Sequence, residues 1–433
     1  MEINEKKPRE SGLSSSKWLF ALCFLVYSAV YIARGNFAYA RSTMLADGVI
    51  DVGSAGILSA VYFGCYAVGQ LINGAAADKR PPFLLVSIGL CVISVTNAAM
   101  TLPVPSAFRI IIWAINGFGQ SMLWCPIFYI ISNVLHSKVR FTAITVVTLC
   151  TPVGKASCAW LSGLAISGGK WQNVFFMASS VIAVVAVLWI SVYLGLRKDI
   201  VLPITSNDEV IKSAEKSRGL FGLLLESGVL FMLPAMLVYG LFLNGVVELI
   251  PSILVKNYDL SSTGAALLDS LIPILGSLGV IVANVLYLKV FKRNDMKSAL
   301  FVMAVSLLPM LVMLALTLGK NDGFLFGKYV DSAMFVVTYG LVYILQLSFG
   351  HFCVSLVPMR FIKFAFAATV SGIANAIGYG GSAIASYAMN YAVERLPLWQ
   401  TVIVWIGCLS AASAFLMVAL VKWNKFVKNM SVE

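Results

Sequence analysis

Tyr27, Tyr31 and Arg34 lie four and three positions apart in a long apolar segment near the amino terminus. Residues at this spacing share one face of a helix, so two phenol hydroxyls and a guanidinium would point the same way. Arginine does not lose its charge, and at the centre of a bilayer it costs about 2.5 to 3.5 kcal/mol. We therefore expect it to face a wet cavity or a partner, and an anion suits this face best. A salt bridge that locks two helices together is the alternative interpretation.

Lys155 is a second cation inside an apolar segment, and Thr151 lies one helical turn before it on the same face. We predict that Lys155 provides a second positive group for the same anion. The alternatives are a lysine that reaches along its helix to the membrane surface, or one that pairs with an acid of another helix. Reaching the surface is difficult from the middle of a span, which favours a functional role.

Three further titratable residues fall inside apolar segments, namely Glu248, Asp269 and His351. Glu248 and Asp269 could bind protons, because removal from water disfavours the charged carboxylate. An ion pair with Arg34 or Lys155 is an equally good interpretation of either acid. His351 is a third candidate for coupling, with a hydrogen bond between helices as the alternative.

The composition identifies an integral membrane protein. The chain has 433 residues, of which 60% are hydrophobic and 12% charged, and its mean hydropathy is +0.90. The apolar runs are long and nearly continuous, which indicates helical spans and excludes a β-barrel of short alternating strands. The first run follows a polar tail and lacks a cleavage site, so we expect it to be retained as a helix.

The same composition excludes several other classes of function. The net charge of +12 comes from basic residues in short loops between spans, where they set topology, rather than from a nucleic-acid-binding patch. The eight cysteines show no C-x-x-C spacing, so neither a disulfide nor a metal site is expected. The sequence contains no G-x-x-x-x-G-K-S/T loop and no Ser/His/Asp constellation. We therefore expect a protein that is not an enzyme and needs no cofactor.

Hydropathy predicts an all-α fold of twelve transmembrane helices in two halves. The predicted spans are 18–40, 53–77, 83–102, 107–135, 142–166, 171–195, 227–254, 264–288, 297–318, 328–357, 366–391 and 398–421. The corresponding parts of the chain are an amino tail over 1–17, a first half over 18–196, a polar linker over 197–226, a second half over 227–421 and a carboxyl tail over 422–433. Weak similarities such as Phe118-Gly119-Gln120 and Phe349-Gly350-His351 favour a duplicated six-helix unit.

The distribution of basic residues predicts that both termini are cytoplasmic. The tails and the even-numbered loops carry 22 Lys and Arg residues, whereas the odd-numbered loops carry seven. By the positive-inside rule, the more basic side faces the cytosol. We expect a monomer in the cell membrane, most simply a bacterial inner or plasma membrane, whose partner is a small anionic substrate.

The loop after the second predicted span is Gly74-Ala75-Ala76-Ala77-Asp78-Lys79-Arg80. A small residue lets two helices pack closely, and an acid at a helix end can pair with bases. An ordinary charged turn is the alternative. The loop resembles the G-x-x-x-D-K/R signature of the major facilitator superfamily. This resemblance implies a transporter whose halves rock about a central site, and a conformational role for Gly74, Asp78, Lys79 and Arg80.

The first-span residues resemble a narrower group. Tyr27, Tyr31 and the run Arg34-Gly35-Asn36-Phe37 match the Y…Y-x-x-R-x-N-F pattern of the organophosphate:phosphate antiporter family. Further segments resemble the same family, namely Gly56 with Tyr66, Gly119-Gln120, Trp124-Cys125-Pro126, residues 245–251 and Gly378-Tyr379-Gly380-Gly381-Ser382. The resemblance implies exchange of an organic phosphate for inorganic phosphate, with Arg34 as the anion ligand.

Three positions depart from this family. Its second phosphate-binding arginine falls at Leu243, a span-two lysine falls at Gln70, and a span-five histidine falls near Thr151. We expect Gln70 and Thr151 to line the substrate site, and Lys155 to supply the missing charge, because a dianion removed from water needs more than one cation. A proton-coupled symporter of a monoanionic organic acid is the second hypothesis. A transporter-like sensor of sugar phosphate is the third.

Overall fold

The computed structural model describes residues 12–166, 170–196, 219–260, 262–269, 271–319 and 325–430, and the regular structure in these ranges is helical. The predicted all-α fold is therefore confirmed. The chain forms two compact units, Met1–Ala214 with Pro358–Ile373, and Glu215–Val357 with Ala374–Glu433. Most of the amino tail and of the predicted linker lies outside the described residues, and the predicted domain limits stay a prediction.

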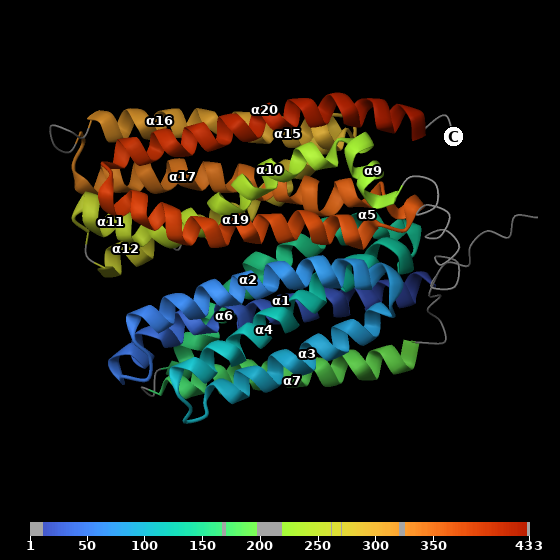
Figure 1. Ribbon diagram of the computed structural model, residues 1–433, viewed down its shortest axis with the longest axis horizontal. Helices are drawn as coiled ribbons and strands as arrows, with labels where there is room; N and C mark the ends of the chain where they lie inside the picture. The colour runs from blue at the N-terminus through green and yellow to red at the C-terminus, as the bar shows by residue number, and fades with distance from the viewer. Residues whose placement is uncertain are drawn as a thin grey trace, which may run out of the picture. The chain divides into compact units, whose positions relative to one another are not determined.

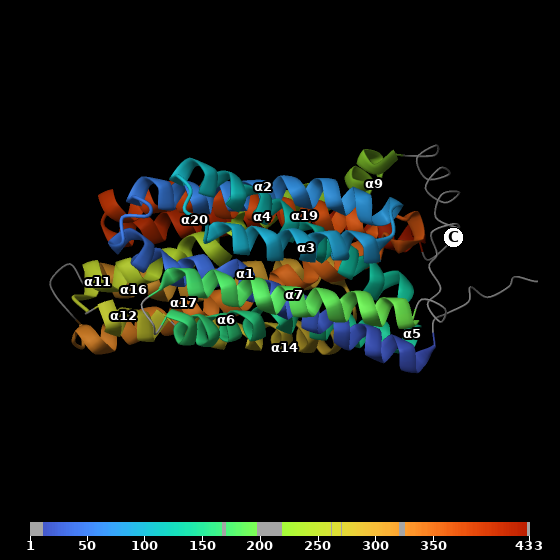
Figure 2. The same ribbon diagram turned by 90° about the horizontal axis from the view of Figure 1, so that it is seen from below.

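The first unit is built of long apolar helices that cover the first six predicted spans. They are α1 (Leu13–Ala46), α2 (Val52–Lys79), α3 (Pro82–Met100), α4 (Ser106–Tyr129), α6 (Cys150–Ile166) and α7 (Trp171–Leu196). A π-helical turn, η1 (Ile130–Val134), extends α4, and α5 (Ser137–Val146) leads through the 3₁₀ turn η2 (Val147–Leu149) into α6. Helix α4 packs on α2 and α3, and α1 packs on α6 and α7 (Figure 1, Figure 2).

The second unit contains more interrupted helices. Its elements are α9 (Gly219–Ser227), α10 (Val229–Gly240), η3 (Leu241–Val246), η4 (Val247–Leu249), α11 (Ile250–Tyr258), α12 (Ser262–Asp269), α13 (Leu271–Gly276), α14 (Leu278–Val285), η5 (Leu286–Val290), α15 (Asp295–Val305), α16 (Leu307–Gly319), α17 (Lys328–Gly350), η7 (His351–Leu356) and α20 (Leu398–Met430). Helices α18 (Val357–Met359) and α19 (Ala367–Arg395), with the turn η8 (Ile362–Phe364) between them, link the two units along the chain. Helix α20 packs along α10, α15 and α16 (Figure 1).

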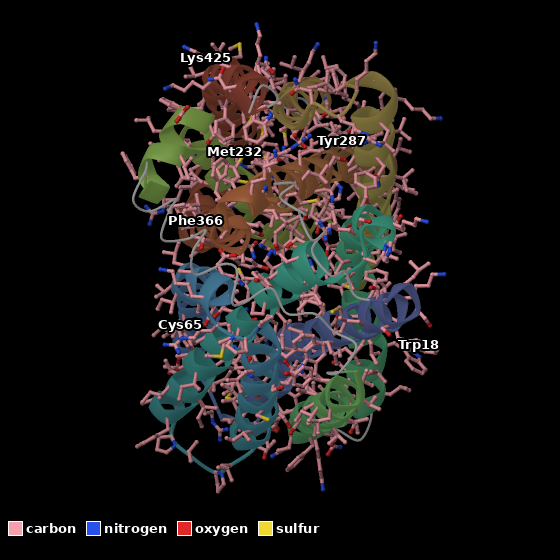
Figure 3. The ribbon with its side chains drawn as sticks, turned by 90° about the vertical axis from the view of Figure 1, so that its right-hand side faces the viewer. Trp18, Cys65, Met232, Tyr287, Phe366 and Lys425 are labelled. Atoms are coloured by element: carbon pink, nitrogen blue, oxygen red, sulfur yellow. The ribbon has the colours of Figure 1, made fainter. Side chains whose placement is uncertain are left out.

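Eleven helices among the described residues are long and apolar enough to cross a membrane. They correspond to all the predicted spans except the eleventh, 366–391. Helix α19 covers that span but is not one of the eleven helices. Large apolar side chains on these helices are exposed, for example Val95 at 66% and Val421 at 73%, as expected where lipid covers them. Trp18, labelled in Figure 3, is 70% exposed at the start of α1, a position typical of indoles at a membrane interface. The protein is thus a multi-pass membrane protein.

Candidate functional site

Arg34 lies roughly 7 Å along the helix axis from the midpoint of α1. Its guanidinium lies over two buried phenol rings, with the Cζ atom 4.7 Å from the ring centroid of Tyr31 and 4.5 Å from that of Tyr66. Tyr31 belongs to the same helix, and Tyr66 belongs to α2. Such cation–π contacts stabilise the charge and restrict the plane of the guanidinium. The residue as a whole is half-buried within a span, and its Nη2 atom is buried.

The fully buried Gln120 of α4 holds the other side of Arg34. The Arg34 Nε donates a hydrogen bond of 3.0 Å to the Gln120 Oε1, and the Tyr62 hydroxyl donates one of 2.6 Å to the same oxygen. The groups that touch Arg34 in these contacts are therefore neutral. Neither Tyr62 nor the role of Gln120 was predicted from the sequence. The role of Gln120 could have been inferred from its position in the middle of an apolar segment, because a buried amide needs hydrogen-bond partners.

Tyr27 extends the aromatic wall beside Arg34. Its ring packs edge-on against Tyr31, with ring centroids 5.5 Å apart, and lies 5.1 Å from the Trp124 ring of α4. The Trp124 Nε1 donates to the Ser371 hydroxyl at 2.9 Å, within the same unit. The structure therefore brings together the predicted face of Tyr27, Tyr31 and Arg34. That this face contacts substrate stays a prediction.

Helix α6 packs closely on α1 along a seam of small residues, Cys150, Gly154 and Cys158. The Cys150 thiol donates to the Phe24 carbonyl at 3.3 Å, and the Cys158 thiol donates to the Ile32 carbonyl at 3.2 Å. Between them, a side chain at Gly154 would collide with the Ser28 carbonyl oxygen and with Tyr31. The contacts repeat every four residues on both helices, as in small-xxx-small packing. This seam fixes α6 against the segment that carries Arg34.

The seam also places Lys155 and Thr151, the two candidate residues of α6. Lys155 follows Gly154 directly and is half-buried, and Thr151 is half-buried in the first turn. Because Gly154 packs against Ser28, Lys155 lies level with about Ala29, roughly 7 Å along the axis from the level of Arg34. A small anion can span such a separation when both side chains are long. The predicted pairing of the two cations stays a prediction.

Gln70 joins two helices of the first unit. Its Nε2 donates a long hydrogen bond of 3.4 Å to the Ser121 carbonyl, and its Oε1 accepts one of 3.1 Å from the Cys125 thiol. The side chain is fully buried. Both ends of the amide thus contact α4, which supports a packing role, and the predicted contact with substrate stays a prediction.

Asp78 caps the start of another helix. Its carboxylate accepts hydrogen bonds from the backbone N–H groups of Ala368 and Thr369, at 3.2 and 2.7 Å, and from the Thr369 hydroxyl at 2.7 Å. A carboxylate is favourable there, because the first N–H groups of a helix lack partners within it. A side chain at Gly74, one turn earlier, would press on the Ala368 carbonyl oxygen and on Gly372. The spacing of Gly74 and Asp78 therefore suits close packing of the first turns of α19, up to residue 373, on α2, whereas Lys79 and Arg80 are exposed beyond them.

Replacing Asp78 by Asn should weaken this cap. One carboxylate oxygen would become an amide N–H₂ that faces a donor, so we expect a loss of about 1 to 3 kcal/mol in unfolding free energy, measured as a lower Tm in detergent. Asp51→Asn is the matched control. Asp51 is exposed and caps the start of α2, where its carboxylate accepts a hydrogen bond from the Ser54 N–H at 2.6 Å. This bond lowers the pKa of Asp51. Asparagine caps a helix equally well. Equal melting of both variants would contradict the assigned role.

The candidates for coupling lie in the second unit. Asp269 ends α12 and interacts electrostatically with Tyr339, whose hydroxyl donates to the Phe242 carbonyl at 2.8 Å. The backbone of Glu248 lies in η4, and its side chain is outside the described residues. His351 begins η7 and is 3% exposed, and neither of its ring nitrogens has a hydrogen-bond partner among the described residues. The predicted roles of all three residues stay predictions.

The family resemblance described above places a missing arginine at Leu243, and this residue lies in the π-helical turn η3. Its neighbour Asn244 donates to the Ser382 hydroxyl at 2.9 Å, and Ser382 donates to the Gly240 carbonyl at 2.8 Å. A side chain at Gly240 would collide with the backbone of Gly378. The glycine-rich segment that precedes Ser382 therefore allows α10 and α19 to approach within this unit.

Comparison with known proteins finds a matching family and several relatives. Residues 23–386 match the family described as the Major Facilitator Superfamily. A probable hexose phosphate transport protein of Chlamydia trachomatis is 26% identical over 37% of this chain and 35% of its own length, so this chain spans about a third of that relative. The glycerol-3-phosphate transporter of Bacillus subtilis is 24% identical over 87% of this chain and 86% of its own. Among solved structures, the proton:xylose symporter XylE bound to 6-bromo-6-deoxy-D-glucose has a TM-score of 0.65 at 12% identity, covering 93% of this chain and 94% of that one.

Proposed function

We propose, from the premise that this chain belongs to the Major Facilitator Superfamily, that it exchanges a small organic phosphate for inorganic phosphate across a membrane by alternating access. The observation that carries the proposal is Arg34, a half-buried cation within a span that bonds Gln120 and lies over the rings of Tyr31 and Tyr66. A charge in this position is costly unless an anion offsets it, and intramembrane charges mark substrate paths. The names of the relatives from Chlamydia trachomatis and Bacillus subtilis make a hexose phosphate and glycerol-3-phosphate the first substrates to test.

In this proposal the first unit grips the phosphoryl group. The Arg34 Nε already bonds Gln120, so an oxyanion would be gripped by the two terminal nitrogens, as in bidentate recognition. Lys155 supplies a second positive charge about one and a half helical turns away, which would balance a dianion. Tyr27 and Tyr31 close the apolar side of the site. The membrane would be a bacterial plasma membrane, with both termini in the cytosol.

Proteoliposomes loaded with labelled inorganic phosphate test this proposal. Efflux should require external phosphate, glycerol-3-phosphate or hexose phosphate, and should proceed without a proton gradient, because antiport needs only a counter-substrate. Lys155→Gln should slow this exchange about tenfold or more, the size expected for one charged hydrogen bond. Lys138→Gln, which alters an exposed lysine of α5, is the control and should leave the rate unchanged.

A second function has one specific observation in its favour. Leu243 provides no second arginine, so Arg34 alone would balance a monoanionic organic acid, and Asp269 would carry the coupled proton. Uptake of a carboxylate that needs a proton gradient, is lost in Asp269→Asn and is not inhibited by phosphate would establish this function and overturn exchange. Rapid phosphate exchange that survives Asp269→Asn would exclude it.

A further inference from the structure

A chain of buried side-chain hydrogen bonds leads from Arg34 through α4 to α3. Gln120 accepts from the Arg34 Nε, and its own Nε2 donates to the Asn116 Oδ1 at 2.8 Å. The Asn116 Nδ2 donates to the Thr96 Oγ1 at 2.8 Å. Gln120 and Asn116 are fully buried, and Thr96 is 6% exposed. Asn116 and Thr96 are therefore connected to Arg34 through Gln120.

Thr96 fixes the direction of the Asn116 amide. A hydroxyl has one proton, and the Thr96 Oγ1 lies 2.7 Å from the Val92 carbonyl oxygen and 3.2 Å from that of Ile93. A carbonyl only accepts, so the Thr96 proton points to its own helix and the oxygen must accept from Asn116. Asn116 therefore turns its N–H₂ to Thr96 and its carbonyl oxygen to Gln120.

The same logic sets the amide of Gln120. Its N–H₂ faces two acceptors, the Asn116 oxygen and the Ala33 carbonyl, the latter at 3.1 Å. Its oxygen faces two donors, the Arg34 Nε and the Tyr62 hydroxyl. A flipped amide would face the Arg34 Nε–H with its N–H₂, and the Ala33 and Asn116 oxygens with its own oxygen, whereas the Tyr62 hydroxyl could rotate to accept. The amide is thus held in the one orientation that accepts from Arg34.

We propose that Thr96, Asn116 and Gln120 form a positioning relay for Arg34, an inference that rests on the proposed anion site. The rings of Tyr31 and Tyr66 set the plane of the guanidinium, and the Gln120 oxygen sets its rotation within that plane. The relay holds the guanidinium through its Nε–H, so the two terminal nitrogens keep a fixed position. Its members are neutral, so they orient the charge without cancelling it, and a phosphate or carboxylate group finds the fork already aligned.

Thr96→Val tests the relay at its far end. The change keeps the shape of the side chain but removes the acceptor that orients Asn116, so the Asn116 oxygen loses its fixed direction toward the Gln120 N–H₂. We expect the Kd of the purified protein for inorganic phosphate to rise about five- to tenfold, the size of one lost neutral hydrogen bond in the site. Thr96→Ser restores the hydroxyl and should restore the Kd. Thr338→Val is the control, because Thr338 is also buried and bonds its own helix, at the Met334 carbonyl.

Gln120→Glu tests the neutrality of the relay. A carboxylate in place of the amide would pair with Arg34 and compete with the substrate, so the phosphate Kd should rise by about a hundredfold. Gln120→Met removes the bonds without adding charge and should have a smaller effect. If Gln120→Glu binds phosphate no worse than Gln120→Met, the claim that neutrality matters is overturned.

A readout without substrate separates failure of the relay from failure of the proposed function. Phenylglyoxal modifies the terminal nitrogens of arginine, and peptide mass spectrometry gives the rate at Arg34. The relay requires this rate to change in Thr96→Val and not in Thr338→Val. If wild-type protein does not bind phosphate but the rate changes, the proposed function falls and the relay stands. If wild-type protein binds phosphate and Thr96→Val changes neither Kd nor rate, the relay is wrong.

Discussion

Arg34→Ala and Arg34→Lys should each weaken binding of inorganic phosphate by roughly ten- to hundredfold while the protein still inserts and folds. Alanine removes the charge. Lysine keeps a charge but loses the planar fork, the Nε–H bond to Gln120 and the broad cationic face that lies over Tyr31 and Tyr66. Equilibrium binding of labelled phosphate to purified protein measures the effect.

Arg109→Lys is the matched control for this prediction. Arg109 is a buried arginine of the same unit, with its Cζ 5.2 Å from the Trp171 ring centroid. It lies at the start of α4 and bonds the Met100 carbonyl. The Arg109→Lys substitution should lower the melting temperature without changing the affinity for phosphate. Wild-type affinity in Arg34→Lys would show that bidentate recognition by this arginine is wrong.

Gly154→Leu should destabilise the protein by about 3 kcal/mol or more, the upper part of the range for overpacked sites. A side chain at this position meets the Ser28 backbone and the Tyr31 ring, neither of which can move without displacing α1. The helices must separate, which shifts Lys155 relative to Arg34. We expect a lower Tm, a smaller folded fraction in size-exclusion chromatography, and loss of phosphate binding in the protein that remains folded.

Gly163→Leu provides the control within the same helix. Gly163 is exposed, and a side chain there would meet no atom within 4 Å. Leucine should therefore be tolerated on a face that lipid covers. If both glycine variants melt alike, the close seam between α1 and α6 does not hold this part of the fold.

The sequence predicted the helices and the membrane location because these features depend on short-range patterns. An apolar run of about 20 residues can satisfy its backbone in lipid only as a helix, whatever the rest of the chain does. Hydropathy therefore located the spans. It missed their interruptions, such as the π-helical turns η3 and η7, because those depend on how neighbouring helices pack.

In the candidate site, the sequence by itself placed Tyr27, Tyr31 and Arg34 on one face, since helical periodicity alone fixes the direction of residues three and four apart. It also marked Asp78 and Gly74 through their spacing. It did not give the partners of any of them. Gln120 is 86 residues from Arg34, and Thr369 is 291 residues from Asp78, and no local rule links residues at such separations.

Which polar groups form hydrogen bonds with one another depends on the tertiary structure. Gln70 and Lys155 look alike in the sequence as polar residues inside spans, but Gln70 bonds α4 through both ends of its amide, whereas Lys155 stands half-buried beside the seam on α1. The direction of the Asn116 amide likewise depends on Thr96, which lies in another helix. Hydropathy predicts which residues lie within the membrane. The packing of small residues such as Gly154 brings helices close enough to pair their polar groups, and that pairing is a property of the assembled bundle.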